Sequence, residues 1–435
     1  MRRIRVIVRH IVFFKPACIN YSSAHSGCGI IGSMTTNKHH ALYLALTVVA
    51  LILPTIFIMQ SGTGDTKIFL EWMDTMLQYG PIQGFTELHR DYPPLTPLVL
   101  YLIGGLANLI SLDHFLAFKL SLLIGNWLVW WIMWRWSKHY WLSLGMYLGM
   151  ILNTVIMGYS DVYIAVVLLL GLWCLQQKRW YLATSLLTLM MFLKWTPLVL
   201  GLPLFIYVGY STYRQDGWKL LFTQAALPAV ALSSVIISYF GYTALHDAWI
   251  YASSQTFLSG NALNVNWLLT GWLHWRNPLA YGGLEAGVTY IQLSDVQLMQ
   301  WLRWLFYAVY FFTVGVFLFK RKTLEQFLIM SLLAYLAYFL FNLGVHENHL
   351  FFAMMISGAL TAVDRRYWPL LVGWALAFNL NLLSFFGEFR SWRVLGGFDT
   401  SLLFAGLNVL GWLLTWWYYG LTNWIFHRSS STQHS

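Results

Sequence analysis

The chain has 435 residues, of which 58% are hydrophobic, 18% are aromatic and only 10% are charged, and its formal net charge is +10. Because an average soluble domain carries about 25% charged residues, this composition excludes a soluble enzyme, a nucleic-acid-binding module and a disordered protein. Apolar runs recur from Ala41 to Gly420 and predict one all-α, multi-spanning membrane domain over residues 41–420.

The two ends of the chain differ from this apolar middle. Residues 1–40 are basic and then Ser/Gly-rich, without the long apolar run and cleavage site of a signal peptide. Met34 is a candidate alternative start, which would make residues 1–33 dispensable. Residues 421–435 form a Ser-rich tail that we expect to be disordered.

About twelve spans are expected between these ends, some of them short for a hydrocarbon core of about 30 Å. The short ranges 180–193, 195–211 and 350–363 are interpreted as tilted, broken or partly re-entrant. The expected spans cover residues 41–60, 115–134, 140–157, 162–177, 180–193, 195–211, 218–240, 301–320, 323–343, 350–363, 367–386 and 400–419.

The apolar stretch 95–110 decides the orientation of the chain. As a helix it reaches only about 24 Å, which favours a position in the membrane interface. The basic clusters then share one side with the basic N-terminus, as the positive-inside rule requires; they lie at 135–138, 178–179, 214–219, 320–322, 365–366 and 428. We therefore predict cytoplasmic termini, and outer segments at 61–94, 158–161, 194, 241–300, 344–349 and 387–399.

Carboxylates concentrate on this predicted outer face, where ionisable groups near membrane depth are costly and indicate function. They are Asp65, Glu71, Asp74, Glu87, Asp91, Asp161, Glu347, Glu388 and Asp399. The simplest interpretation of Glu71, Asp74 and Glu87 is that they are solvated loop acids.

Two segments of the first outer loop have a distinctive order. Residues 64–73, from Gly64 to Met73, predict an amphipathic helix with Asp65 at or near its N-cap, a position that aspartate favours for purely structural reasons. Residues 91–96 read Asp-Tyr-Pro-Pro-Leu-Thr, in which the prolines fix an extended turn and permit a helix to start. Asp91 is thus a second candidate cap.

The order of these segments resembles the GT-C superfamily of polyprenyl-phosphate-sugar-dependent glycosyltransferases, most closely the dolichyl-phosphate-glucose glucosyltransferases of N-glycan assembly. The pair His346-Glu347 is similar to a His-Glu motif of that group. The chain departs from the pattern at residues 158–161, where Gly-Tyr-Ser-Asp replaces a His-rich turn, as in many bacterial polyprenol-phosphate mannosyltransferases. It departs again where Lys194-Trp195 stands for Lys-Gln.

The resemblance implies a GT-C type helical bundle with interfacial helices in the first outer loop. It also implies inverting transfer of a hexose, mannose or glucose, from a polyprenyl phosphate to an acceptor hydroxyl on the non-cytoplasmic face, without a cofactor. A hydroxyl is a weak nucleophile that needs a general base, and Asp65 is the expected base. A phosphate leaving group needs no second carboxylic acid, unlike the pair in most glycosidases. Asp91, Tyr92 and Asp161 are expected to contact the acceptor or shape the loops.

The remaining candidates concern the donor. Lys194 could bind the phosphate or simply snorkel, and Arg393 lies in an outer loop that the positive-inside rule disfavours for a cation. Contacts to the phosphate or the sugar are expected from Lys194, His346, Glu347, His349, Arg393, Asn264 and Asn266. No metal site is predicted, because His346 and His349 are spaced i, i+3 instead of the i, i+4 of zinc proteases.

Two other classes compete with this interpretation. A secondary transporter typically has internal repeats and charges at the bilayer midplane, whereas we find no repeat and acids at one face. A flippase or polymerase of lipid-linked sugars shares the hydrophobicity but not the loop at 91–96. The expected partners are a lipid-linked or glycan acceptor and membrane lipids, without nucleic acid. The only Asn-x-Ser/Thr sequon, at Asn20, lies on the predicted cytoplasmic side, so no outer glycosylation site indicates the secretory pathway. The short chain and the Gly-Tyr-Ser-Asp turn at 158–161 favour a bacterial plasma membrane over the endoplasmic reticulum.

Overall fold

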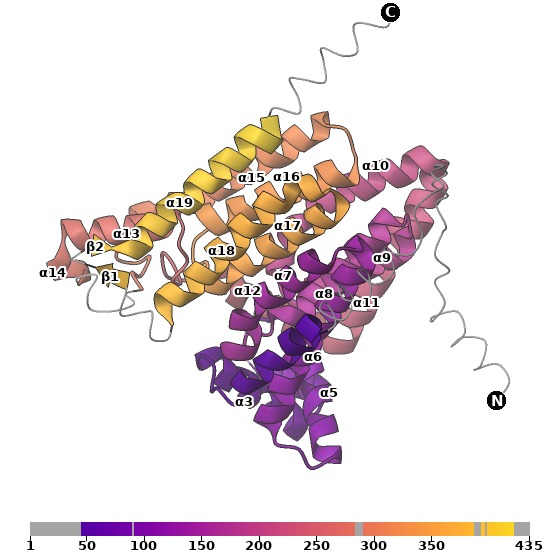
Figure 1. The fold of residues 1–435 in the computed structure, drawn as a ribbon, viewed down its shortest axis with the longest axis horizontal. Helices are drawn as coiled ribbons and strands as arrows, with labels where there is room; N and C mark the ends of the chain where they lie inside the picture. Colours follow the sequence, from indigo (N-terminus) through magenta and orange to yellow (C-terminus); the bar gives the residue numbers. More distant parts are fainter. Residues whose placement is uncertain (1–44, 89–90, 283–289, 387–392, 396–397, 422–435) are drawn as a thin grey trace, which may run out of the picture. The chain divides into compact units, whose positions relative to one another are not determined.

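The computed structural model of the chain describes residues 45–88, 91–282, 290–386, 393–395 and 398–421 (Figure 1). These residues are almost entirely helical, in agreement with the predicted all-α class. Contacts divide the chain into two units, Met1–Val49 and Ala50–Ser435, and the helices named below belong to the second unit. The predicted basic segment 1–40 and residues 422–435 of the predicted tail lie outside the described residues.

Three helices follow the apolar stretch Ala45–Phe57, the last part of which is a 3-10 turn, η1 (Leu53–Phe57). Gly80 has a φ of 76°, which ends the first helix because only glycine adopts this conformation readily, and Pro81 then opens the second. The three are α3 (Gly64–Tyr79), α4 (Pro81–Glu87) and α5 (Leu95–Leu109). α3 and α5 lie where the sequence predicts helices at 64–73 and 95–110, and they pack against each other.

The bundle that follows consists of α6 (His114–Ser137), α7 (Tyr140–Ile151), α8 (Asp161–Gln176), α9 (Trp180–Leu193), α10 (Gly201–Leu220), α11 (Leu227–Phe240), α15 (Leu302–Phe319), α16 (Leu324–Phe341), α17 (Phe351–Val363), α18 (Trp368–Phe385) and α19 (Thr400–Thr415). Short 3-10 or π-helical turns extend several of them: η2 (Leu152–Ile156), η3 (Thr196–Leu200), η4 (Leu221–Ala226), η6 (Gln297–Trp301), η7 (Glu347–Leu350), η8 (Arg365–Tyr367) and η10 (Trp416–Leu421). Each predicted span range overlaps one of these helices or the stretch Ala45–Phe57.

The predicted count of about twelve spans is not confirmed. Among the described residues, six helical stretches are long and apolar enough to cross a membrane: His114–Ser137, Gly217–Phe240, Gln297–Phe319, Leu324–Phe341, Arg365–Phe385 and Thr400–Gly420. Most of the other predicted ranges hold shorter apolar helices. A transmembrane helix needs about 20 residues, so the shorter helices do not by themselves support further spans.

The centre of the core is formed by α16 and α17. In α16, 72% of the candidate span is buried inside the protein, and nearly every residue of α17 is buried. A helix that is apolar on all sides belongs in the interior, and Figure 1 shows both helices surrounded by their neighbours. The connection 342–350 between them is therefore held by the most deeply buried helices of the described bundle.

The chain reverses direction between α10 and α11. Gly217 has a φ of 64°, and a Cβ atom added at Gly209 would lie 3.8 Å from the Leu221 side chain. A straight helix would separate residues 209 and 221 by about 18 Å. Their proximity therefore places a tight turn near Gly217, in the basic segment that the sequence predicts as a loop.

The predicted outer segment 241–300 is helical over much of its described length. It contains α12 (Tyr242–Ser253), α13 (Val265–Arg276) and α14 (Pro278–Tyr281). Between α12 and α13 the chain runs beside residues 342–347: the Gly260 amide donates to Val345 O at 2.9 Å, and the Glu347 amide donates to Gly260 O at 3.1 Å. A short hairpin pairs β1 (Val394–Leu395) with β2 (Phe398–Asp399) in an antiparallel register.

Candidate active site

Asp65 is the second residue of α3, and its carboxylate does not cap the helix. The N-cap is Thr63, which makes no capping hydrogen bond with its side chain. Asp91 does not cap α5 either, because Pro94 occupies that position. Neither carboxylate therefore caps its helix, although Asp65 lies in the first turn of α3, where a negative charge interacts favourably with the helix dipole.

The start of α3 is tied to the turn that precedes α8. The Thr63 amide and the Thr66 hydroxyl both donate to Met157 O, at 2.9 and 3.2 Å. The next residue, Gly158, has a φ of 77°, and a Cβ atom there would lie 2.1 Å from Thr66 Oγ1. Only glycine fits at position 158. This contact of Thr63 and Thr66 with Met157 and Gly158, called the seam below, fixes Asp65 relative to the turn at 158–161.

Tyr159, from the same turn, donates its hydroxyl hydrogen bond to the carboxylate of Glu347. The backbone of Glu347 is held from two more directions: its amide donates to Gly260 O, and its carbonyl accepts from Asn381 Nδ2 at 3.1 Å. Burial raises the pKa of Glu347, and the Tyr159 hydrogen bond opposes this shift. Glu347 is thus a fixed, buried acid.

A buried ion pair joins α8 to the end of α9. Lys194 Nζ lies 2.7 Å from Asp161 Oδ1, while Asn153 and Asn348 donate to the other carboxylate oxygen at 3.3 and 3.1 Å. Burial alone would lower the pKa of Lys194, but Asp161 holds it well above its ordinary value. Lys194 is only 6% exposed, which contradicts a snorkelling lysine. Its charge lies 5.4 Å from the centre of the Tyr92 ring.

The two histidines stand beside this pair. The Tyr338 hydroxyl lies 3.1 Å from His349 Nδ1, and the Tyr335 hydroxyl donates to His349 O at 2.9 Å. The rings of His346 and His349 have their centroids 5.7 Å apart. Burial lowers the pKa of both histidines, most strongly that of His349, so both rings are neutral at pH 7. No group of three His, Cys, Asp or Glu side chains within the described ranges could hold a metal ion.

Several of these groups act on Asp65 electrostatically. Its pKa is raised to about 6, first by burial and then by the carboxylates of Glu347 and Asp91, whereas Lys194, and His346 when it is protonated, act to lower it. Contacts and electrostatics together therefore gather one cluster from residues far apart in the sequence. The predicted site residues in this cluster are Asp65, Asp91, Tyr92, Asp161, Lys194, His346, Glu347 and His349.

Three other predicted site residues lie outside this cluster and bind the protein itself. Asn264 caps α13 by accepting from the Trp267 amide at 2.9 Å, and it donates to Phe339 O at 2.9 Å. Asn266 Nδ2 donates to Asn342 O at 2.6 Å. Arg393 Nε lies 3.2 Å from Asp399 Oδ2. Asp399 therefore pairs with the positive charge that suggested an anionic ligand. Glu388, one of the acids predicted on the outer face, lies outside the described residues.

Four further polar residues belong to the cluster and were not predicted. Tyr159 and Asn348 stand inside motifs already singled out, but nothing in the sequence shows that they reach Glu347 and Asp161. Asn153 and Asn381 lie in apolar runs. A polar side chain at membrane depth is costly unless it has partners, and this rule could have identified both.

Comparisons with known proteins leave the chemistry to be argued from this geometry. No family model matches the chain, and no curated protein sequence matches it. The resemblance noted in the sequence stays a hypothesis.

The seam between α3 and the turn can be tested at Gly158. We expect Gly158→Ala to lower the melting temperature in detergent, because the left-handed backbone costs about 1–2 kcal/mol and the new methyl group collides with Thr66. Gly145→Ala is the control, since a Cβ there meets no atom within 4 Å. Equal melting temperatures for the two variants would contradict this geometry.

The buried pair gives a second test. Lys194→Met leaves Asp161 charged and unpaired, so we expect a loss of about 3–5 kcal/mol, measured by thermal or denaturant unfolding. Adding Asp161→Asn removes the orphaned charge, so the double variant should recover a substantial part of this loss. A double variant as unstable as Lys194→Met would show that the two side chains are not energetically coupled.

Proposed function

We propose that the protein is a membrane glycosyltransferase that moves a hexose from a polyprenyl-phosphate donor to an acceptor hydroxyl on the non-cytoplasmic face. One observation supports this above the others: the partly buried Asp65 has a pKa of about 6 and stands where α3, the turn at 158–161 and the connection 342–350 meet. A base with a pKa near the working pH combines a high ionised fraction with useful basicity.

In this proposal Asp65 is the general base. Its carboxylate takes the proton of the acceptor hydroxyl while the hydroxyl oxygen attacks the anomeric carbon from the face opposite the phosphate. The bond between that carbon and the phosphate oxygen breaks, and its electron pair stays on the phosphate, so the configuration inverts. Glu347 and Asp91 keep Asp65 basic enough for this task by opposing its ionisation.

The charge balance limits how the donor phosphate is bound. Four acids of the cluster, Asp65, Asp91, Asp161 and Glu347, face a single lysine, and Lys194 is already paired with Asp161. Among the described residues, neutral donors are thus better placed than a free cation to contact the phosphate. A neutral imidazole offers one N–H donor, and we assign this contact to His346.

The position of the cluster favours an enzyme over a secondary transporter. Asp161 begins α8, Lys194 follows α9, and Glu347 begins η7, so the charges stand at the ends of helices. Transporters typically place such groups in the middle of broken helices, near the bilayer midplane. The proposed orientation puts these helix ends on the non-cytoplasmic side of a bacterial plasma membrane, with both chain termini on the cytoplasmic side.

The base is tested by Asp65→Asn in purified protein supplied with polyprenyl-phosphate mannose and polyprenyl-phosphate glucose. We expect transfer to fall by about 10²–10⁴-fold, the usual contribution of a general base. Glu71→Gln is the matched control, because Glu71 is exposed on the same helix. Full activity of Asp65→Asn would refute the role of Asp65, and no transfer by the wild-type protein from either donor would refute this donor assignment.

The thermal stability of Asp65→Asn should not fall together with its activity. The pKa of Asp65 in the folded protein lies above that of an unfolded aspartate, so its contribution favours the fold at low pH and is lost as the pH rises through about 6. At pH 7.5 the neutral asparagine avoids this cost. We therefore expect Asp65→Asn to melt no lower than the wild-type protein, so loss of activity with a lowered melting temperature would indicate a structural role instead.

The pH dependence of transfer follows from the same group. Because the base must be ionised, kcat/KM should rise about tenfold per pH unit below pH 6 and level off above it. Steady-state rates between pH 4.5 and 8 measure this profile. A profile that is flat through pH 6 would exclude a base with the pKa of Asp65.

A further inference from the structure

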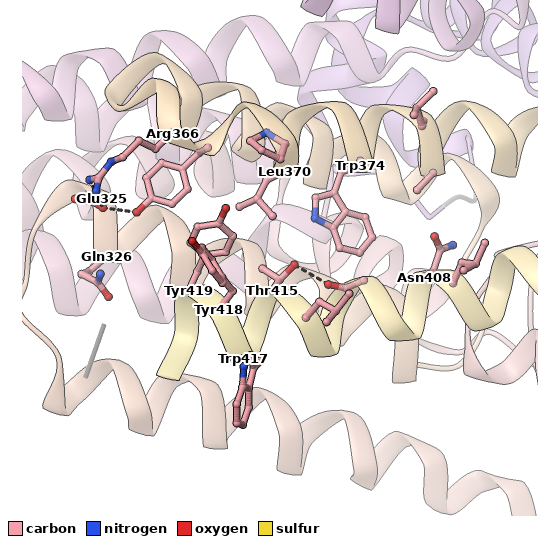
Figure 2. Close-up of a pocket in the computed structure, with 18 of the residues that line it drawn as sticks. Glu325, Gln326, Arg366, Leu370, Trp374, Asn408, Thr415, Trp417, Tyr418 and Tyr419 are labelled. Carbon is pink, nitrogen blue, oxygen red and sulfur yellow. Dashed lines mark hydrogen bonds and ion pairs between the residues drawn. The ribbon is translucent and has the colours of Figure 1, made fainter. Parts of the chain in front are cut away.

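A cavity of about 1630 Å³ lies between α16, α18 and α19, and none of the residues that line it belongs to the candidate active site (Figure 2). Sites for small molecules usually measure about 300–1000 Å³, so this cavity suits a larger ligand. Its walls are mostly apolar, with Leu370 and Trp374 on one side and Leu407 on the other.

The cavity is long as well as large. Arg366 and Leu380 both line it, and the helical rise of about 1.5 Å per residue puts them about 21 Å apart. Glycines leave the space open: a Cβ atom at Gly373 would meet no other atom within 4 Å. A cavity of this length and polarity is suited to hydrocarbon chains.

One end of the cavity is cationic. Lys320, Arg321 and Arg366 line it there, and Figure 2 shows Arg366 beside Glu325. Arg366 is already paired, with Asp364 Oδ2 at 2.6 Å and more loosely with Glu325. Within the described ranges, neither Lys320 nor Arg321 forms an ion pair with a carboxylate, although the buried Lys320 Nζ donates one hydrogen bond to Gly420 O. This end therefore keeps an excess of positive charge.

Polar and aromatic groups complete the same end. Gln326 Oε1 is buried and accepts no hydrogen bond from any described residue. Trp417, Tyr418 and Tyr419 also line the cavity, and such residues favour the boundary between lipid chains and headgroups. A ligand that has an anionic group and hydroxyl donors next to its hydrocarbon chains would complement this arrangement.

This cationic end lies far from the candidate active site. α16 begins beside the cavity, at Leu324, and ends at Phe341, just before the connection that carries Glu347. The 18 residues of α16 span about 27 Å, close to the hydrocarbon thickness of a membrane. A donor lipid with its phosphate near Asp65 would thus have its headgroup at the opposite interface.

We propose that the cavity binds an anionic glycerophospholipid from the leaflet that borders the basic loops. The phosphate contacts Lys320 and Arg321, the glycerol headgroup reaches Gln326, and the acyl chains lie along α18 and α19. This site is separate from sugar transfer and holds whether or not the protein is a glycosyltransferase.

The test uses the full-length protein in phosphatidylcholine nanodiscs, titrated with phosphatidylglycerol and followed by native mass spectrometry or by a fluorescent phosphatidylglycerol. The wild-type protein should retain phosphatidylglycerol in preference to phosphatidylcholine. Arg321→Gln should weaken this binding about fivefold, the loss expected from one basic side chain at an anionic lipid. Equal retention of the two lipids by the wild-type protein would overturn the proposal.

Variants that fill the cavity test whether the lipid binds inside it. Gly373→Phe should abolish selective retention, and Leu407→Trp should weaken it from the opposite wall, at a half-exposed position where folding is not at risk. Gly406→Phe on α19 is the matched control, because Gly406 does not line the cavity and a Cβ there meets no atom within 4 Å. Unchanged binding by Leu407→Trp, or equal losses in Leu407→Trp and Gly406→Phe, would place the lipid elsewhere.

Discussion

The buried pair of Lys194 and Asp161 is the contact on which the candidate site depends. A buried charge without a partner costs several kcal/mol, so α8 and the end of α9 are stable only when these two side chains meet. The same carboxylate then accepts from Asn153 and Asn348. One interaction thus fixes α8, the end of α9, η2 and η7 relative to one another, and the acids of the site are arranged around it.

The environment of Asp65 shows a tension between folding and chemistry. An acid with a raised pKa disfavours the folded state at neutral pH, and the neighbouring carboxylates increase this penalty. The seam at Met157 and the hydrogen bonds to Glu347 supply the rigidity that keeps these like charges close. Strained groups of this kind concentrate where a protein performs its function.

Much of the fold could be predicted because local signals mark it. Gly80, Pro81 and Pro94 bound the helices of the first outer segment, and the apolar runs mark the helices of the bundle. The number of spans could not be predicted, since hydrophobicity alone does not report helix length or burial. Eight members of the cluster are predicted site residues, but their partners could not be predicted: nothing in the sequence pairs Lys194 with Asp161, 33 residues away, or assigns Asn264 to a helix cap.

The pairing of residues 258–260 with 344–347 has a consequence for how this protein can evolve. The segment that carries His346 and Glu347 is held there by main-chain hydrogen bonds, which do not depend on the identity of the side chains. Most positions in the pairing can therefore change their side chains without loss of these main-chain hydrogen bonds. The exceptions are Gly260, where a Cβ atom would lie 2.9 Å from the His346 ring, and Gly344, which has a φ of 65° and where a Cβ atom would lie 2.4 Å from the Gln255 side chain.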